Sequence, residues 1–301
     1  MPDISIILPV YNGQETIAET LQSLLSQTFQ DFELCICIDG SDDNSERIIA
    51  NFSDQRIRLI RNQENFGLGR TLNRLVALAH PSSKYIAMAE QDDFYYPERL
   101  SLQYQYMQSH SDVGMVSGIA EHFNGERVTF TFPGILVNGT NYPENLVENF
   151  LLNYCYQVKV VNSCMMFRKS VHQENGLYFS MHYPSLSVDW AYILRFSLVS
   201  KIQGISKPLV RLDRRPKRNS LTTKKKLQFE TARQLIDDFY YEKKAIISKK
   251  EYKTAITTEH LMELSAMPYI RKVFSFFFSF LNNPTDERWL GYVKKHILRI
   301  R

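Results

Sequence analysis

The sequence predicts an α/β fold, with a doubly wound, mostly parallel sheet flanked by helices and a helical extension at the C-terminal end. Two observations predict it. Over the first hundred residues, short apolar runs alternate with helix-periodic segments, which is the pattern of successive βαβ units. From Leu227 onward the chain reads as helices. With 301 residues, 44% of them hydrophobic and 23% charged, the chain has the composition of a globular protein with room for a sizeable core.

The alternation can be followed along the chain. Apolar runs predict strands, and apolar residues three and four positions apart predict the helices between them. Strands are expected at residues 4–8, 33–38, 56–61, 85–89, 113–119, 163–167 and 207–212. Helices are expected within residues 17–25, 48–52 and 68–79, with two more opening at Pro97 and Asp189. Right-handed crossovers place the carboxyl ends of parallel strands on one edge, so Tyr11, Asp39, Asn65 and Asp92 should converge on one crevice.

An acidic segment follows the fourth expected strand. The apolar residues 86–89 run directly into Glu90, Gln91, Asp92 and Asp93. Carboxylates at this end of a parallel strand point into the crevice where α/β sheets bind ligands. A hard divalent cation, Mg²⁺ or Mn²⁺, shared with a phosphate would offset their mutual repulsion. The alternative is an acidic helix start, because anions are favoured before a helix N-terminus.

Three other positions suggest chemistry. Asp39 ends the second strand, where its carboxylate can accept a hydrogen bond from the imide N–H of uracil or thymine, and the Tyr11 ring can lie on a base. For Asp42 and Asp43 a turn or helix cap is the preferred interpretation. Asp189 is the candidate general base, since removing a proton from a hydroxyl needs a carboxylate within hydrogen-bond reach. A simple helix-start carboxylate is the alternative.

Charge and cysteine content indicate the compartment and exclude some partners. The net charge of +4 does not indicate nucleic-acid binding, although basic residues crowd positions 214–226. The cysteines Cys35, Cys37, Cys155 and Cys164 lack zinc-site spacing and suit a reducing compartment. The sequence shows no signal peptide and no run of about 18 apolar residues. A cytoplasmic protein is expected. The phenylalanine-rich residues 274–281 form either core or, with nearby basic residues, a contact at the inner face of the membrane.

Together these features resemble family 2 glycosyltransferases, an inverting group with the GT-A fold, over roughly residues 3–222. Residues 4–12 resemble the family's opening strand and Tyr-Asn loop, residues 24–34 its helix-to-strand linker, and residues 38–41 its Asp-Asp-Gly-Ser. Residues 65–73 resemble its Asn-x-Gly-Leu stretch, and residues 89–100 its Asp-x-Asp-Asp segment. Residues 164–169 resemble its acceptor-side strand, residues 189–190 fall at its Glu-Asp base, and residues 208–222 resemble its closing loop. The family pattern differs at Ile38, Glu90 and Val188, which replace acids, and at Arg214 and Arg215, which stand where a histidine is usual.

The resemblance implies a role for each matching residue. Asp39 would hold the base, Asp92 the ribose and Asp93 the metal, and Asp189 would be the catalytic base. The implied nucleotide-sugar site comprises Pro9, Tyr11, Asn12, Asp39, Asn65, Gly67, Arg70, Asp92, Arg214 and Arg215, and the implied metal residues are Asp93 and Asp92. Residues 1–115 would form the nucleotide-sugar-binding half of one GT-A domain, residues 116–222 its acceptor-binding half, and residues 223–301 a C-terminal helical region.

The implied activity is inverting transfer of a sugar from a nucleotide diphosphate sugar, with UDP favoured, to a hydroxyl of a saccharide or lipid-linked acceptor. Such enzymes commonly build surface polysaccharide or lipopolysaccharide. Two alternatives remain at this point. A sugar-1-phosphate nucleotidyltransferase would need a glycine-rich opening loop, which residues 9–13 do not supply. A non-catalytic nucleotide-sugar-binding protein with a decayed site would fit the departures at Glu90, Val188 and the missing histidine.

Overall fold

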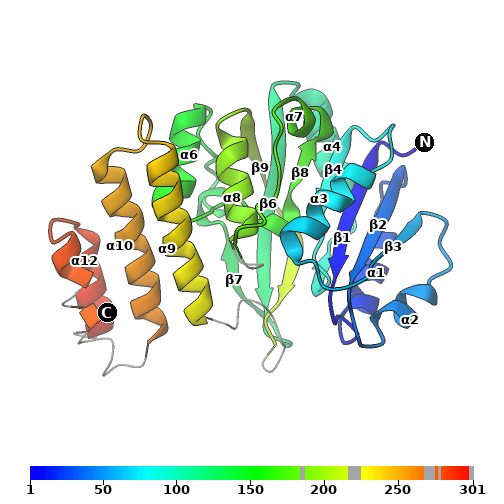
Figure 1. The fold of residues 1–301 in the computed structure, drawn as a ribbon, viewed down its shortest axis with the longest axis horizontal. Helices are drawn as coiled ribbons and strands as arrows, with labels where there is room; N and C mark the ends of the chain where they lie inside the picture. The colour runs from blue at the N-terminus through cyan, green and yellow to red at the C-terminus, as the bar shows by residue number, and fades with distance from the viewer. Residues whose placement is uncertain (184–186, 216–224, 268–274, 277–278, 298–301) are drawn as a thin grey trace.

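One mixed sheet forms the centre of the molecule, and helices pack on its two faces (Figure 1). The computed structural model describes residues 1–183, 187–215, 225–267, 275–276 and 279–297. In the described part the strand order is β3-β2-β1-β4-β8-β6-β9-β5, with β7 paired to β6. The strands are β1 Ile4–Val10, β2 Phe32–Asp39, β3 Ile57–Asn62, β4 Tyr85–Met88, β5 Asp93–Tyr95, β6 Val113–Phe123, β7 Val128–Phe132, β8 Met166–Arg168 and β9 Lys201–Asp213.

The first half of the chain confirms the predicted alternation. Strands β3, β2, β1 and β4 are all parallel. Between or after these strands lie α1 Ile17–Leu25, α2 Ser45–Ala50, α3 Leu68–Leu78 and α4 Arg99–Ser109. Strand β1 is buried along its whole length, and alternate residues contribute to different cores, with Ile6 and Leu8 in one and Ile7 in the other. The doubly wound α/β fold class is therefore confirmed.

Several predicted boundaries are wrong for identifiable reasons. Strand β1 continues through Pro9 to Val10, still paired with β2. Pro9 has no N–H to donate, but the pairing of β1 with β4 ends at Ile7, so no hydrogen bond of the sheet is lost at Pro9. Asp93 does not begin a helix; it begins β5, which pairs with β9. Pro97 precedes α4 by two residues. Residues 162–164 form a 3-10 turn before the short β8, and β9 is longer than expected since it absorbs Gly204 and Pro208.

The second half joins the sheet with mixed polarity. Strand β6 runs parallel to β9 and antiparallel to β7 and β8, while β8 is antiparallel to β4. The helices of this half are α5 Gly134–Val137, α6 Leu146–Cys155, α7 Lys169–Glu174 and α8 Val188–Ser197, with the 3-10 turn η1 at Asn162–Cys164. The four cysteines are free and buried.

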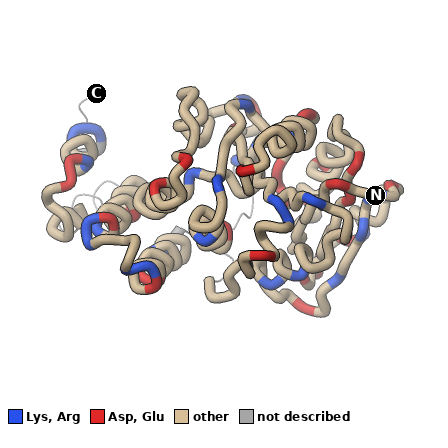
Figure 2. The backbone as a smooth tube through the Cα atoms, turned by 90° about the horizontal axis from the view of Figure 1, so that it is seen from above, with Lys and Arg blue, Asp and Glu red and all other residues tan. Residues whose placement is uncertain are grey.

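The C-terminal helices stand beside α6 and α8, away from the first strands (Figure 1). They are α9 Lys225–Glu242, α10 Lys249–Ala266, α12 Arg288–Tyr292 and a π-helix at Val293–Ile297. Phe276 packs against Trp289 and Tyr292, which favours the core interpretation for that residue, whereas Leu281 is 72% exposed. Phe274, Phe277 and Phe278 lie outside the described residues. No helix of the described part is long and apolar enough to cross a membrane. Acidic and basic residues are interspersed along the molecule (Figure 2).

Candidate active site

Carboxylates from two distant segments meet at one edge of the sheet. Glu90, Asp92 and Asp93 follow β4, and Asp189 lies in the first turn of α8. Burial raises the pKa of Glu90 well above its usual range, and the charges of Asp92, Asp93 and Asp189 add to the effect. Since Asp189 influences the Glu90 carboxyl, the start of α8 lies within electrostatic range of the acidic segment.

Asp93 is the most deeply placed acid of the segment. It is 5% exposed, and its carboxylate accepts a hydrogen bond from the Ser163 hydroxyl of η1. Burial, and then the neighbouring Asp92, raise the pKa of Asp93 to about 8, while Ser163 and Arg214 act in the opposite direction. Asp93 therefore holds a carboxyl whose negative charge is poorly compensated by the protein.

The η1 turn supplies polar partners that sequence reasoning missed. Asn162 donates to the Glu90 carboxylate, and Ser163 donates to Asp93. Both contacts join residues about 70 positions apart, so no local pattern in the sequence could reveal them. Burial also raises the pKa of Asp189, although its own and the Trp190 backbone N–H groups oppose the shift. Glu90, despite its longer side chain, is fixed in place by Asn162.

The loops after β1 and β2 are held together by hydrogen bonds. The backbone N–H of Asn12 donates to Ser41 Oγ at 3.0 Å, and the Asn12 Oδ1 accepts from the Asp42 N–H at 3.0 Å. Asp43 accepts from the N–H groups of Gln14 and Ser45, both at 2.9 Å, which agrees with its predicted role in a turn, although the N-cap residue of α2 is Asn44. These bonds fix the loop that carries Tyr11.

Tyr11 itself presents an exposed ring beside the acidic segment. Its side chain is 47% exposed, and its backbone makes two hydrogen bonds with the Gln91 amide, at 2.9 and 3.0 Å. Gly13 permits this contact, because a Cβ there would lie 2.7 Å from Gln91 Oε1. The sequence showed Gln91 merely as a spacer between acids. The structure shows that its side chain ties the first loop to the acidic segment.

Asp39 is buried and organises the loop before α3. Its carboxylate accepts from Asn62 Nδ2 at 2.6 Å, from the Phe66 N–H at 2.9 Å and from the Gly67 N–H at 3.1 Å. Two of these bonds go to Oδ1 and one to Oδ2, which leaves Oδ2 an acceptor position. Gly67 has a φ of +83°, a conformation that favours glycine. Asn65 supports the same turn by accepting from the Gly67 N–H at 2.9 Å, and Arg70 is exposed in the first turn of α3.

We expect Asp39→Ala to destabilise the protein by about 3 kcal/mol, because it removes three hydrogen bonds and leaves the Phe66 N–H and one N–H of the Asn62 amide without their acceptor. Urea unfolding followed by circular dichroism measures this effect. Asp42→Ala is the matched control, since Asp42 is an exposed carboxylate of the next turn, and its free energy of unfolding should change by less than about 0.5 kcal/mol. Equal effects of the two substitutions would contradict the role of Asp39 in this loop.

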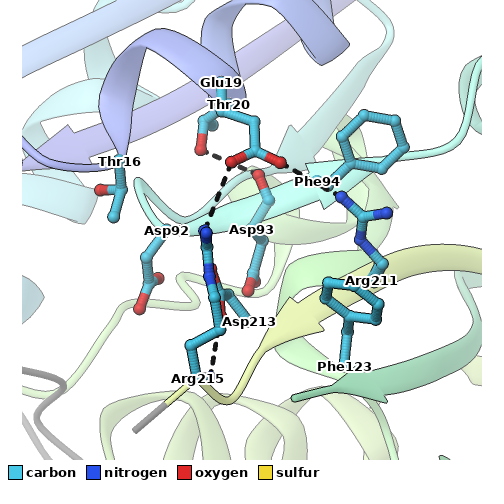
Figure 3. Close-up of a pocket in the computed structure, with 10 residues that line it drawn as sticks. All are labelled: Thr16, Glu19, Thr20, Asp92, Asp93, Phe94, Phe123, Arg211, Asp213 and Arg215. Atoms are coloured by element: carbon cyan, nitrogen blue, oxygen red, sulfur yellow. Dashed lines mark hydrogen bonds and ion pairs between the residues drawn. The ribbon is translucent and has the colours of Figure 1, made fainter. Parts of the chain in front are cut away.

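The two arginines after β9 differ in their surroundings. Arg215 makes hydrogen bonds with both Asp213 carboxylate oxygens and lies 3.5 Å from Glu19 Oε2 (Figure 3). Arg214 instead donates its backbone N–H to Phe123 O at 2.7 Å, and its charge acts on Asp93. Both arginines are candidates to meet a phosphate near Asp93, because Arg215 lines a hollow together with Asp92 and Asp93. The predicted closing loop at residues 219–222 lies outside the described residues.

Two adjoining hollows flank Asp92 at this edge. The larger, of about 250 Å³, lies between the first loop and the acidic segment, with Asn12, Gln14, Asp43 and Gln91 in its wall. The smaller, of about 50 Å³, lies between α1, β5 and the end of β9 (Figure 3). Arg211 lines it and is sandwiched between the rings of Phe94 and Phe123, at 4.4 and 4.6 Å. Asp92 lines both hollows, which suits a residue that contacts a bound ligand.

The donor atoms at this edge fit a hard divalent cation. Within the described residues, no group of three or more His, Cys, Asp and Glu side chains could hold a metal ion. Mg²⁺ is usually bound by one or two carboxylates together with substrate phosphates, so a full protein cage is not required. Asp93, with Asp92 beside it, offers such carboxylate oxygens, and burial and Asp92 raise the pKa of Asp93 despite the nearby charge of Arg214. The residues present therefore fit a metal that is shared with a diphosphate.

Comparison with known proteins identifies the family. A family model described as glycosyl transferase family 2 matches residues 5–176. The chain belongs to this family. Its relatives include a protein of Bacillus subtilis named "Putative glycosyltransferase EpsE", which is 36% identical over 152 residues, 47% of this chain and 54% of EpsE. Another is the Escherichia coli UDP-Glc:alpha-D-GlcNAc-diphosphoundecaprenol beta-1,3-glucosyltransferase WfgD, 31% identical over 152 residues, 50% of this chain and 56% of WfgD. The chain thus spans about half the length of the curated relatives it matches.

Solved structures agree on the fold of this family 2 chain. The S. aureus TarS fragment 1–349 in complex with UDP-GlcNAc has a TM-score of 0.66 at 18% identity, covering 100% of this chain and 82% of the fragment. The mannosyltransferase PcManGT from Pyrobaculum calidifontis, in complex with GDP-Man and Mn²⁺, has a TM-score of 0.62 at 14% identity, covering 92% and 75% of the two chains. These likenesses confirm the GT-A fold that the sequence predicts.

Proposed function

We propose that this chain is an inverting glycosyltransferase that moves a sugar from a nucleotide diphosphate sugar to a hydroxyl of a saccharide or lipid-linked acceptor. The observation that carries the proposal is the cluster of acids after β4, where the charge of Asp189 acts on Glu90 and the charge of Arg214 acts on Asp93. Family membership supports transfer chemistry, and the WfgD name describes a lipid-linked acceptor in that relative. Synthesis of surface polysaccharide or lipopolysaccharide is the expected setting.

The donor site would use the edge of the first four strands. Tyr11 offers a ring for a base, and the remaining acceptor position on Asp39 Oδ2 suits the imide N–H of uracil, which cytosine lacks. TarS binds UDP-GlcNAc on the same fold, which supports UDP as the nucleotide. Asp92 is assigned to the ribose. The backbone of Pro9 and Asn12 and the side chains of Asn65 and Arg70 complete the proposed donor site.

In the proposed mechanism the acceptor oxygen attacks C1 of the sugar as the diphosphate leaves from the opposite side. Asp189 takes the proton from the acceptor hydroxyl, and its raised pKa strengthens it as a base. Arg214 meets the negative charge that develops on the leaving diphosphate. A divalent cation held by Asp93 and Asp92 would neutralise part of that charge when bound, as Mn²⁺ accompanies GDP-Man in PcManGT. Arg215, which forms an ion pair with Glu19, is also assigned to the donor site.

The proposal includes cytoplasmic residence with contact at the inner face of the membrane. Support comes from the C-terminal region, where Leu281 and Leu290 are exposed and Leu290 is followed within five residues by the exposed Lys294 and Lys295. Co-sedimentation with vesicles tests this contact. We expect the protein to sediment with vesicles that contain anionic lipids but not with neutral vesicles. A protein that sediments with neither kind of vesicle would contradict the contact.

A thermal-shift panel tests the donor site. Ligands that bind the folded state raise its stability, by about 2.7 kcal/mol at a free concentration of about 100 Kd. We expect UDP to raise the melting temperature, Mn²⁺ to increase the UDP effect, and CDP to have a smaller effect. Equal shifts with UDP and CDP would contradict the role of Asp39, and an effect of UDP that Mn²⁺ leaves unchanged would contradict the role of Asp93.

Turnover distinguishes the remaining alternatives. The family match favours a glycosyltransferase over a nucleotidyltransferase. A decayed site is a second candidate, because Val188, which is buried, occupies the position of a common family acid. Release of UDP from a UDP-sugar by the wild-type chain supports the enzyme. Tight UDP binding without release from any UDP-sugar would support the decayed site.

A further inference from the structure

The edge strand β7 exposes apolar side chains close to the candidate active site. Phe130 is 55% exposed and Val128 is 41% exposed, and their two-residue spacing puts them on one face of the strand. Native proteins usually protect edge strands with charge, proline or a covering element. The exposed aromatic and branched side chains of β7 therefore indicate a surface that binds a ligand or a partner.

The register of the sheet connects this surface to the acids. His122 of β6 lies opposite Phe130 of β7 and also opposite Leu212 of β9, and Leu212 lies opposite Asp93 of β5. Residues directly opposite on neighbouring strands carry their side chains on the same face. Because strands are about 4.8 Å apart, the row of four places Phe130 about 14 Å from Asp93 along the sheet. A short saccharide chain spans that distance.

Side-chain contacts define the surface further. The His122 and Phe130 rings meet edge to face with centroids 5.3 Å apart, and Phe130 and Phe132 lie 6.4 Å apart. Burial and then the charge of Arg214 lower the pKa of His122, and the charge of Arg214 also acts on Asp93. Arg214 therefore lies within electrostatic range of two of the four residues in the row. We call His122, Phe130 and Phe132 the β7 platform.

We propose that the β7 platform binds a pyranose ring of a saccharide acceptor by stacking it on Phe130. This inference rests on the proposed function, because it places the acceptor beside the assigned donor site. Aromatic rings offer a rigid apolar face that suits the C–H face of a sugar. The His122 imidazole can exchange hydrogen bonds with the sugar hydroxyls. Sugar residues beyond the one that reacts would lie on the platform, while the reacting hydroxyl lies near Asp189.

Saturation-transfer difference NMR tests the platform directly. The probes are methyl glycosides of glucose, galactose, mannose and N-acetylglucosamine and disaccharides of the same sugars, with UDP and Mg²⁺ present. We expect the ring protons of at least one probe to receive saturation from the wild-type chain. Phe130→Ala should weaken that probe's binding about tenfold, and Phe130→Trp should retain it. Tyr241→Ala is the matched control, since Tyr241 is 67% exposed on α9, and it should bind the probe as the wild type does.

Each outcome has a defined meaning. No saturation of any probe by the wild type, or saturation that Phe130→Ala leaves unchanged, would overturn the platform. Light scattering on a sizing column gives a further check, because a wild-type dimer that Phe130→Ala converts to monomer would assign β7 to self-association and overturn the acceptor role. The UDP thermal shift should be the same in all variants. Failure of the wild type to bind UDP would instead count against the proposed function, so the two failures are distinguishable.

Discussion

Replacing Asp189 by asparagine is expected to lower the rate of sugar transfer by about 10²–10⁴-fold, because the acceptor hydroxyl loses its general base. The same change should raise the melting temperature of the ligand-free chain. Burial raises the pKa of Asp189, so the ionised carboxylate costs stability at neutral pH, and a neutral amide of the same shape removes that cost. UDP release in the presence of an acceptor, and a thermal melt of each variant, measure the two effects.

Asp112→Asn is the matched control for Asp189. Asp112 is an exposed carboxylate outside the acidic segment and is paired with Lys201 at 2.7 Å. The hydrogen bond from Lys201 holds the pKa of Asp112 below its usual value. Its replacement should leave transfer unchanged and should not raise the melting temperature. Asp189→Asn that transfers sugar at the wild-type rate would contradict the assignment of the base.

The pH dependence of transfer should carry the same signature. A general base must be ionised, so the rate falls as the pH drops through the pKa of Asp189. Because that pKa is raised, the acidic limb of the wild-type profile should lie at higher pH than an ordinary aspartate would give. The residual activity of Asp189→Asn should lack this limb. A wild-type rate that stays constant down to the usual aspartate range would contradict the assignment.

Replacing Asp93 by asparagine is expected to abolish the effect of Mn²⁺ on UDP binding. It should also stabilise the ligand-free chain increasingly between pH 5 and pH 9. The pKa of Asp93 is raised to about 8, chiefly by burial and then by Asp92. Wild-type stability therefore falls as the pH rises toward that value and is not recovered above it, while the asparagine variant lacks this loss. Thermal melts of both proteins across that pH range, with and without UDP and Mn²⁺, measure the effect.

Asp43→Asn provides the opposite expectation within the same edge. Burial alone would raise the pKa of Asp43, but the hydrogen bonds from Ser45 and Gln14 outweigh burial and lower that pKa. Its replacement should lower the melting temperature at neutral pH, because the charged form is the one that the loop stabilises. An Asp93→Asn variant that melts below the wild type at pH 9, or still responds to Mn²⁺ with UDP, would contradict the metal assignment.

The order of strands and helices in the first hundred residues follows from local pattern. Strand β2 and helix α1 were predictable because their apolar spacing matches a single period and their ends carry turn residues. The expectation that Asp39 and Asp92 lie at one edge followed from the handedness of the crossovers. The resemblance to family 2 then assigned roles that spacing alone left open.

The rest of the site depends on contacts between distant segments. Ser163 reaches Asp93, and the Gln91 amide ties down Tyr11, across 70 and 80 positions of the chain. Strand β5 was missed because three residues after an acidic cluster carry too little periodicity to mark a strand. Arg214 and Arg215 are adjacent in sequence, but only Arg215 forms ion pairs with Asp213 and Glu19 among the described residues. The run of basic residues alone did not predict this difference.

Crystals of the chain grown with UDP and Mn²⁺ test the central claim most directly, through anomalous scattering from manganese. The account predicts a manganese peak directly bonded to the Asp93 carboxylate and to oxygens of both UDP phosphates, with uracil beside the Tyr11 ring and its imide N–H on Asp39. Manganese bound elsewhere, or UDP seated away from the edge formed by β1, β2 and β4, would contradict it.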